Sequence, residues 1–204
     1  MTPTRHLRVI CASAILLVAP DARAAVIHLL PPNISVSPGS TVILDLTISD
    51  LGGATVGDFD VDIGFDPAAL TFQGVTLGTA LGDVGAGEAI DFGSGLLLPG
   101  LVNVVEVSLL APAALAALQS PPFSLALLEF EVSSLAAGKS TLVEILQVNA
   151  LGDSGGIALA VANLEHSTLR RPSASPVPEP ATGLLFLSGA SLAVFLRRQK
   201  LREG

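Results

Sequence analysis

The 204-residue sequence contains a single cysteine, no tryptophan and no tyrosine, and only 14% of its residues are charged. One cysteine excludes a disulfide framework and a cysteine-based zinc site. Lysine and arginine are scarce as well, ten against eighteen acidic residues, which gives a net charge of −8. A nucleic-acid-binding protein needs a basic surface to displace phosphate counterions, so this class is excluded. Apolar residues make up 50% of the chain, which excludes intrinsic disorder.

The few basic residues are concentrated at the two ends of the chain. Residues 25–168 contain fifteen acidic residues and one basic residue, Lys139, for a net charge of −14. The other nine basic residues lie before or after this stretch. The pattern predicts an acidic central domain between two targeting segments.

The N-terminal segment has the three parts of a secretory signal peptide. Arg5 and Arg8 precede an apolar run over residues 9–19, which is followed by Ala22-Arg23-Ala24. We therefore expect a signal helix in residues 1–24, cleavage after Ala24 and export of the remainder. A buried N-terminal helix is the alternative interpretation.

The C-terminal segment combines a proline motif, an apolar stretch and a basic cluster. The apolar residues 181–196 would span about 24 Å as a helix, slightly short of the ~30 Å hydrocarbon core. Basic residues after such a span favour a cytoplasmic C-terminus and leave the rest of the chain outside. We expect one transmembrane helix there. The proline motif is Val177, Pro178, Glu179 and Pro180, and the membrane-stop cluster is Arg197, Arg198, Lys200 and Arg202.

This arrangement resembles the PEP-CTERM sorting signal of Gram-negative bacteria that make extracellular polysaccharide. The resemblance covers residues 178–202, after a linker over residues 169–177. It implies recognition and cleavage by exosortase, a membrane enzyme. The protein would first reside in the cell-envelope membrane with its domain outside the cytoplasm, and would reach the cell surface or the medium after processing. An ordinary single-pass anchor is the alternative.

Residues 25–168 show the period-two alternation of β-strands, with one short helical stretch at Pro112–Gln119. Many short strands separated by glycine and proline turns predict an all-β, antiparallel, jelly-roll-like sandwich. The expected strands are Val26–Leu30, Asn33–Val36, Thr41–Ser49, Gly57–Phe65, Leu70–Leu77, Ala89–Phe92, Val102–Leu109, Phe123–Val132, Thr141–Val148 and Gly156–Leu164.

Three segments of this domain resemble the cohesin domain. They are Val36-Ser37-Pro38-Gly39-Ser40-Thr41-Val42, Phe65-Asp66-Pro67-Ala68-Ala69-Leu70 with Phe72-Gln73-Gly74-Val75, and Phe130-Glu131-Val132 with Gly138-Lys139-Ser140-Thr141. Cohesins are jelly-roll-like sandwiches related to carbohydrate-binding modules, and they bind dockerin modules. The resemblance implies a dockerin-like protein as the partner, with an extracellular polysaccharide as the other possibility.

One strand carries three aspartates on the face opposite its apolar residues. Phe59, Val61, Ile63 and Phe65 are expected in the core, and Asp58, Asp60 and Asp62 on the outside. Carboxylate oxygens suit Ca²⁺, so these three aspartates are a candidate calcium site. The alternative is a solvated strand face that discourages edge-to-edge aggregation.

No catalytic motif stands out in the chain. Gly152-Asp153-Ser154-Gly155-Gly156 spells the nucleophile motif of chymotrypsin-like proteases, but neither His28 nor His166 has that family's sequence context. The absence of tryptophan and tyrosine weakens carbohydrate stacking. We therefore expect an exported, non-catalytic interaction module and not an enzyme. A carbohydrate-binding or matrix-structural protein is the alternative.

Overall fold

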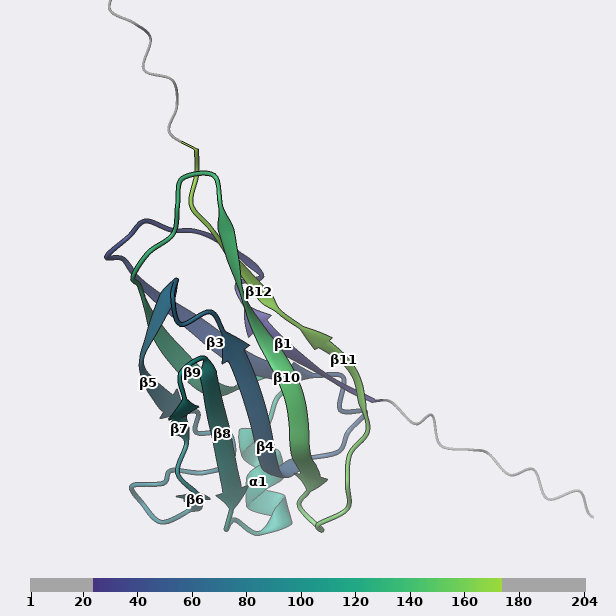
Figure 1. Cartoon of the computed structure of the whole chain (residues 1–204). Helices are drawn as coiled ribbons and strands as arrows, with labels where there is room; N and C mark the ends of the chain where they lie inside the picture. The colour runs from purple at the N-terminus through teal and green to yellow at the C-terminus, as the bar shows by residue number, and fades with distance from the viewer. Residues whose placement is uncertain (1–23, 174–204) are drawn as a thin grey trace, which may run out of the picture. The chain divides into compact units, whose positions relative to one another are not determined.

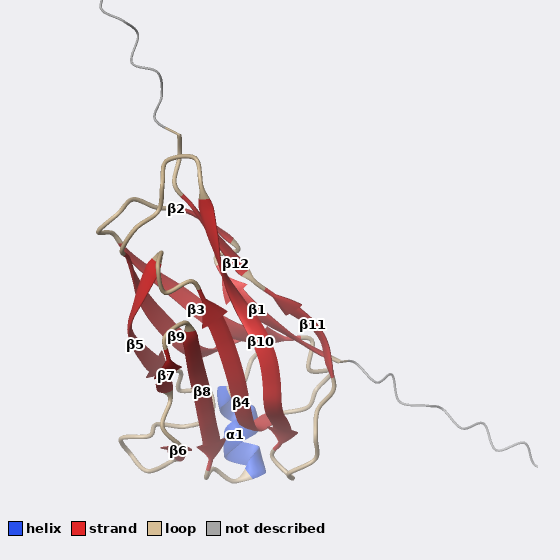
Figure 2. Cartoon of the chain, in the orientation of Figure 1, coloured by secondary structure: helices blue, strands red, loops and turns tan. Residues whose placement is uncertain are grey.

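The computed structural model describes residues 24–173. The expected signal helix, sorting motif, transmembrane helix and basic cluster lie outside these residues. Among the described residues, no helix is long and apolar enough to cross a membrane. The described residues form a β-sandwich with one short helix, α1 (Pro112–Leu118), at one end (Figure 2).

The strands form two sheets that pack face to face (Figure 1). Sheet A has the strand order β11 (Val161–Glu165), β1 (Ala25–Leu30), β3 (Thr41–Ser49), β9 (Phe123–Val132) and β5 (Leu70–Leu77). Sheet B has the order β2 (Asn33–Ser35), β12 (Ser167–Arg170), β10 (Ser140–Asp153), β4 (Val56–Phe65), β8 (Leu101–Ser108) and β6 (Ala89–Asp91), and β7 (Gly95–Leu98) also pairs with β8. The predicted all-β sandwich is confirmed.

The core lies between the sheets and is built by the predicted alternation. Phe59, Val61 and Ile63 of β4 are almost completely buried, while the aspartates between them face outward and are half-buried. Phe130 of β9 is fully buried and meets the rings of Phe65 and Phe72 edge-on, at centroid distances of 5.2 and 5.6 Å. Burying a side chain of this size stabilises the fold by roughly 1.5–3 kcal/mol, which makes these aromatic contacts a major part of the core.

Two strand pairs are parallel, which corrects the expectation of a wholly antiparallel sandwich. β1 pairs with β11 in parallel, and β2 pairs with β12 in parallel. In both pairs a strand from the start of the domain lies beside one from its end. One edge of each sheet is therefore formed by pairing between the first and last segments of the domain. Alternation within a strand contains no information about such long-range pairing, so the sequence did not indicate it.

Strand boundaries differ from expectation toward the C-terminal end. β10 continues to Asp153, past the predicted end at Val148, and turns back so that Asp153 N donates to Ile157 O at 2.8 Å. β11 consequently begins later than predicted, at Val161. β7 was not predicted, and β12 extends to Arg170, within the segment assigned to the linker.

Gln119, just after α1, connects three segments at the α1 end of the sandwich. Its Oε1 accepts a hydrogen bond from Val56 N at 2.7 Å, and its Nε2 donates to Val56 O at 2.7 Å and to Ala80 O at 3.2 Å. Val56 opens β4 and is fully buried. Gln119 thus satisfies backbone groups at the start of the strand that carries the aspartates.

Candidate functional site

Asp60 and Asp62 form a hydrogen-bonded cluster with two asparagines on the outer face of sheet B. Asn103 Nδ2, from β8, donates to Asp60 Oδ1 at 2.6 Å and to Asp62 Oδ1 at 2.9 Å. Asn149 Nδ2, from β10, donates to Asp60 Oδ1 and Asp62 Oδ2, both at 3.1 Å. Two neutral amides therefore bridge two like charges and reduce their mutual repulsion. We call this outer surface of β10, β4 and β8 the acid–amide face.

Asn149 reaches the cluster because β10 is irregular beside β4. The register between these strands shifts between Val148 and Ala150, so Asn149 is an extra residue without a partner in the ladder. A second shift, between Ile145 and Gln147, leaves Leu146 as another extra residue. Such β-bulges redirect side chains locally, which explains how Asn149 is added to the aspartate face.

Asp58 has different surroundings from those of Asp60 and Asp62. Its carboxylate packs against Gly152, where any Cβ atom would collide with it. Burial, with a smaller contribution from the negative charge of Asp153, raises the pKa of Asp58 above its ordinary value. The three aspartates predicted as a calcium site are therefore divided into an amide-bridged pair and a separate carboxylate. Within residues 24–173, no three acidic, histidine or cysteine side chains are grouped so that they could hold a metal ion.

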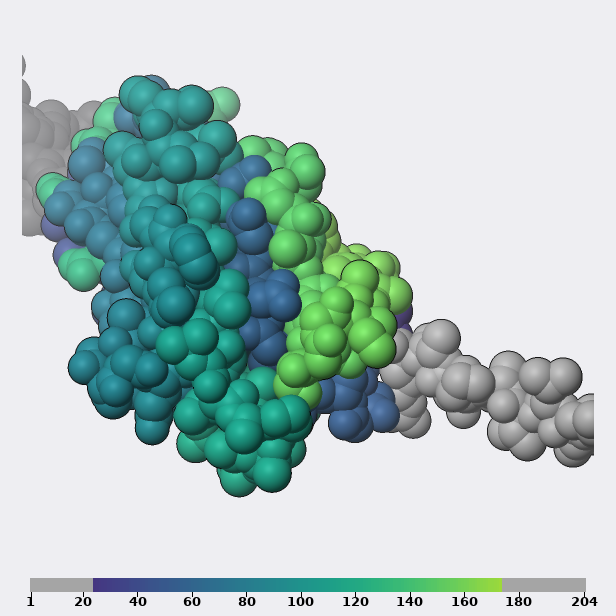
Figure 3. Space-filling model, turned by 90° about the horizontal axis from the view of Figure 1, so that it is seen from below, coloured from purple at the N-terminus to yellow at the C-terminus, as the bar shows by residue number. Residues whose placement is uncertain are grey.

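Exposed leucines flank the acid–amide face at one end. Leu146 of β10 is 53% exposed and lies over Gly64 of β4, where a Cβ would approach its side chain at 2.8 Å. Gly64 pairs with Leu101 of β8, and Leu101 pairs with Leu98 of β7, which is 54% exposed. Figure 3 shows the blue β4 region exposed between the teal β8 side and the green β10 side. Exposed apolar side chains of this kind are what the buried core of a protein interface is built from.

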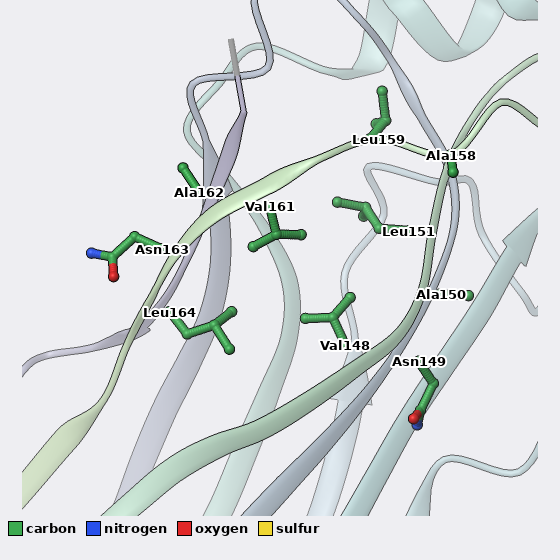
Figure 4. A pocket seen from close by; sticks show the side chains of 10 residues that line it. All are labelled: Val148, Asn149, Ala150, Leu151, Ala158, Leu159, Val161, Ala162, Asn163 and Leu164. Carbon is green, nitrogen blue, oxygen red and sulfur yellow. The ribbon is translucent and has the colours of Figure 1, made fainter. Parts of the chain in front are cut away.

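A crevice of about 580 Å³ lies between β10 and β11. Figure 4 shows Val148 and Val161 extending into the space between the strands, whereas Asn149 and Asn163 point away from it. None of its ten lining residues is charged. The crevice therefore offers no group for acid–base or nucleophilic chemistry.

The protease-like motif around Ser154 does not form a catalytic site. Ser154 Oγ accepts a hydrogen bond from Thr55 Oγ1 at 3.0 Å. His166 instead contacts β10, where its Nδ1 accepts a hydrogen bond from Ile145 N at 3.1 Å. The motif instead covers the end of β10 and the turn that follows it.

Sequence reasoning placed the aspartates on the outer face but missed Asn103 and Asn149. The alternation of β8 could have indicated Asn103, because it falls on the face opposite the buried Val102 and Val104. Asn149 gave no such signal, since its position depends on a bulge.

Two packed sheets, one of which carries a hydrogen-bonded polar cluster and exposed leucines on its outer face, define a β-sandwich. The chain belongs to the cohesin domain family, whose model matches residues 28–162. Residues 176–200 match the PEP-CTERM protein-sorting motif. Both resemblances seen in the sequence are thereby confirmed, and the chain is an exported cohesin-like module with a C-terminal sorting signal.

Solved cohesin structures share this fold at low sequence identity. The cohesin CaCohA2 from Clostridium acetobutylicum has a TM-score of 0.58 and 21% identity, and the match covers 76% of this chain and 95% of that one. The seventh ScaB type I cohesin from Pseudobacteroides cellulosolvens has a TM-score of 0.59 and 11% identity, with 77% and 97% covered. A type I cohesin–dockerin complex from Clostridium thermocellum matches with a TM-score of 0.58 and 10% identity, covering 72% and 99%.

Curated proteins yield no significant match to the sequence. Cohesin domains are non-catalytic interaction modules, which agrees with the prediction that the chain is not an enzyme.

Proposed function

We propose that the chain is an exported binding module that captures a dockerin-like protein on its acid–amide face. The observation that carries this proposal is the cluster of Asp60, Asp62, Asn103 and Asn149, which presents carboxylates held in place by amides from both neighbouring strands. A side chain fixed by hydrogen bonds loses little conformational entropy when a partner binds. The exposed leucines at one end of the face supply apolar contact area.

The charge of the domain favours a partner with basic or hydroxyl groups at the contact. Fifteen acidic residues against one lysine give residues 25–168 a net charge of −14. Such a surface attracts cationic groups at low salt and repels anionic polymers. An acidic extracellular polysaccharide is for this reason a poorer partner than a dockerin-like protein.

Binding measurements on face-specific variants test this proposal. Dockerin-like proteins encoded in the same genome are titrated against the mature chain, and their affinities are compared for Asp60→Ala, Asn149→Ala and Glu129→Ala. Glu129 is the matched control because it is an exposed acidic residue on β9 of the other sheet. We expect the first two substitutions to weaken binding at least about thirtyfold, the loss typical of an interface hot spot, and the third to leave it unchanged. Equal losses for all three, or binding to polysaccharide alone, contradict the proposal.

The sorting signal assigns the C-terminal segment a role in delivery. In this proposal residues 181–196 hold the exported chain in the envelope membrane, the cluster of Arg197, Arg198, Lys200 and Arg202 stays cytoplasmic, and exosortase cleaves near Val177-Pro178-Glu179-Pro180. Mass spectrometry of the mature protein checks this. Peptides from beyond Pro180 should be absent from released material and should persist in a strain that lacks exosortase. Their presence in released wild-type protein would mean that the segment is an ordinary anchor.

A further inference from the structure

A serine, a histidine and a glutamate form a connected chain on the outer face of sheet A. His28 of β1 lies between them, with its Nε2 2.9 Å from Ser49 Oγ of β3 and its Nδ1 2.9 Å from Glu165 Oε2 of β11. The order hydroxyl, imidazole, carboxylate and both distances are those by which an enzyme's histidine base activates a serine. His28 is only 20% exposed and Glu165 is 50% exposed, so the histidine is partly shielded from water.

The positions of the protons define two states of this chain. When His28 is neutral, its Nδ1–H donates a hydrogen bond to Glu165, and its unprotonated Nε2 accepts a hydrogen bond from the Ser49 hydroxyl. When His28 is an imidazolium, both of its nitrogens donate, and the Ser49 hydroxyl donates instead to Asp50 Oδ2 at 3.0 Å. Only the neutral state prepares Ser49 for attack, so its reactivity depends on deprotonation of His28.

A cavity of about 340 Å³ adjoins Ser49. It is bordered by the loop after β3 and by Pro121 and Pro122, which supply apolar walls. In this loop Ala54 N donates to Leu51 O, whereas the amides of Gly52 and Gly53 form no hydrogen bond to another described residue. Gly52 and Gly53 have φ angles of 64° and 95°, and successive amides in such turns form concavities that bind anions. Both glycines line the same cavity as Ser49, where their amides would be the donors for a developing oxyanion.

Thr47, beside the histidine, has a hydroxyl group without a hydrogen-bond partner among the described residues. It pairs directly with His28 across β1 and β3, and it is 6% exposed. A buried hydroxyl without a partner costs free energy unless something else satisfies it. A carbonyl or carboxylate oxygen of a ligand near His28 would do so.

We propose that Ser49 is a covalent acylation site for activated acyl esters, with His28 as its general base and Glu165 as the positioning residue. Ser49 Oγ attacks the ester carbonyl and forms a new C–O bond while its proton passes to His28 Nε2. The bond between the carbonyl carbon and the leaving group then breaks, and the leaving oxygen takes the proton from His28. The products are an acylated Ser49 and the free alcohol. This reactivity goes beyond the proposed binding function and does not require its partner.

Besides Glu165, two other carboxylates lie near Ser49 and His28. Asp50 follows Ser49, and its Oδ2 accepts a hydrogen bond from the Ser49 hydroxyl when His28 is an imidazolium. Asp45 lies two pairs from His28 along the ladder between β1 and β3, and its Oδ1 accepts a hydrogen bond from Ser124 Oγ. A general base acts only in its unprotonated form, so acylation should accelerate with rising pH.

Labelling of the full chain with a fluorescent fluorophosphonate tests the proposal. Ser49 Oγ displaces fluoride from phosphorus, which leaves a stable adduct that mass spectrometry locates. We expect wild type and Ser154→Ala to be labelled at Ser49 and Ser49→Ala to lose this label. His28→Ala should slow labelling by about a hundredfold, the lower range of general base catalysis. Glu165→Gln should slow it less and shift its pH profile.

Acetylation by p-nitrophenyl acetate provides an independent readout. The wild type should release p-nitrophenol in a burst and carry the acetyl group on Ser49. Thermal melts of each variant separate loss of fold from loss of reactivity, and the pH profile of the wild type requires no variant. Absence of labelling from folded wild-type protein, or equal labelling of Ser49 and Ser154, overturns the proposal.

Discussion

Glu106 lies directly opposite Asp91 across the β6–β8 pair, and within residues 24–173 only Asp91 has hydrogen-bond donors. The side chain of Glu106 is fully buried, and neither of its oxygens has a hydrogen-bond partner among the described residues. Asp91 Oδ1 accepts hydrogen bonds from Gly93 N at 2.9 Å and from Ser94 N at 2.7 Å. Burial alone would raise the pKa of Asp91, but the hydrogen bonds from Ser94 and Gly93 lower it. Below about pH 7 the pair therefore holds its negative charge on Asp91 and a proton on Glu106.

This proton makes the stability of the domain depend on pH. Burial, together with the charge of Asp91, raises the pKa of Glu106 from 4.5 to about 7. Between these two values the folded chain keeps a proton that the unfolded chain has lost. The free energy of unfolding should therefore decrease by about 3 kcal/mol as the pH rises from 4.5 through 7, and the loss should be complete above that. Urea unfolding at several pH values measures it.

Glu106→Gln provides the matched test of this pH dependence. The amide has the same shape but does not ionise, so the decrease between pH 4.5 and 7 should largely disappear. At pH 8 the variant should be more stable than the wild type by roughly 2 kcal/mol, since the buried charge is gone. Parallel pH curves for the two proteins would show that the decrease comes from other groups.

Truncation of Phe130 should strongly lower the stability of the domain. Phe130→Ala removes a fully buried ring and its edge-on contacts with Phe65 and Phe72. The unfolding free energy should fall by about 3–5 kcal/mol, the usual range for a buried phenylalanine. Phe92→Ala is the control, because Phe92 is 64% exposed and its loss should change stability little. Equal effects of the two changes would be incompatible with this description of the core.

Gln119→Ala tests the connection between α1 and β4. The change leaves Val56 N and Val56 O without their partners at a fully buried residue. We expect a loss of about 1–3 kcal/mol, measured by chemical denaturation. Gln119→Glu retains an acceptor for Val56 N but has no donor for Val56 O, so it should not restore stability. A neutral effect of Gln119→Ala would mean that water replaces the side chain.

Calcium binding by Asp58, Asp60 and Asp62 remains a prediction, and the structure changes which residues it should involve. A Ca²⁺ ion at this face would take oxygens from Asp60 and Asp62, and the amides of Asn103 and Asn149 would turn to present theirs. Calcium should then raise the melting temperature of the wild type and of Asp58→Asn, but not of Asp62→Asn. Calorimetric titration without heat, together with an unchanged melting temperature, would eliminate the site.

The sequence allowed prediction of most strands and the core face of β4, because alternation is a local property that each strand carries by itself. It could not indicate that β1 pairs with β11, because that pairing joins residues more than a hundred positions apart. Asn149 shows the same limit within a site, since a bulge in β10 turns it toward Asp60. The alternation of β8 places Glu106 on the same face as the buried Val104. Because a carboxylate is rarely buried without a partner, the sequence did not indicate that Glu106 would be buried. His28, Ser49 and Glu165 come together only through strand pairing across sheet A.

β12 determines how this domain would bear a mechanical load. It pairs with β10 from Ser140↔Arg170 to Val143↔Ser167 and with β2 on its other side. In a chain tethered by the segment after Arg170, tension acts along β12, away from the acid–amide face on the rest of β10. The hydrogen bonds on both sides of β12 are then loaded in shear, so they must break together and cannot open one at a time. A partner held on β10 and β4 would therefore load the hydrogen bonds of β12 to both neighbouring strands at the same time.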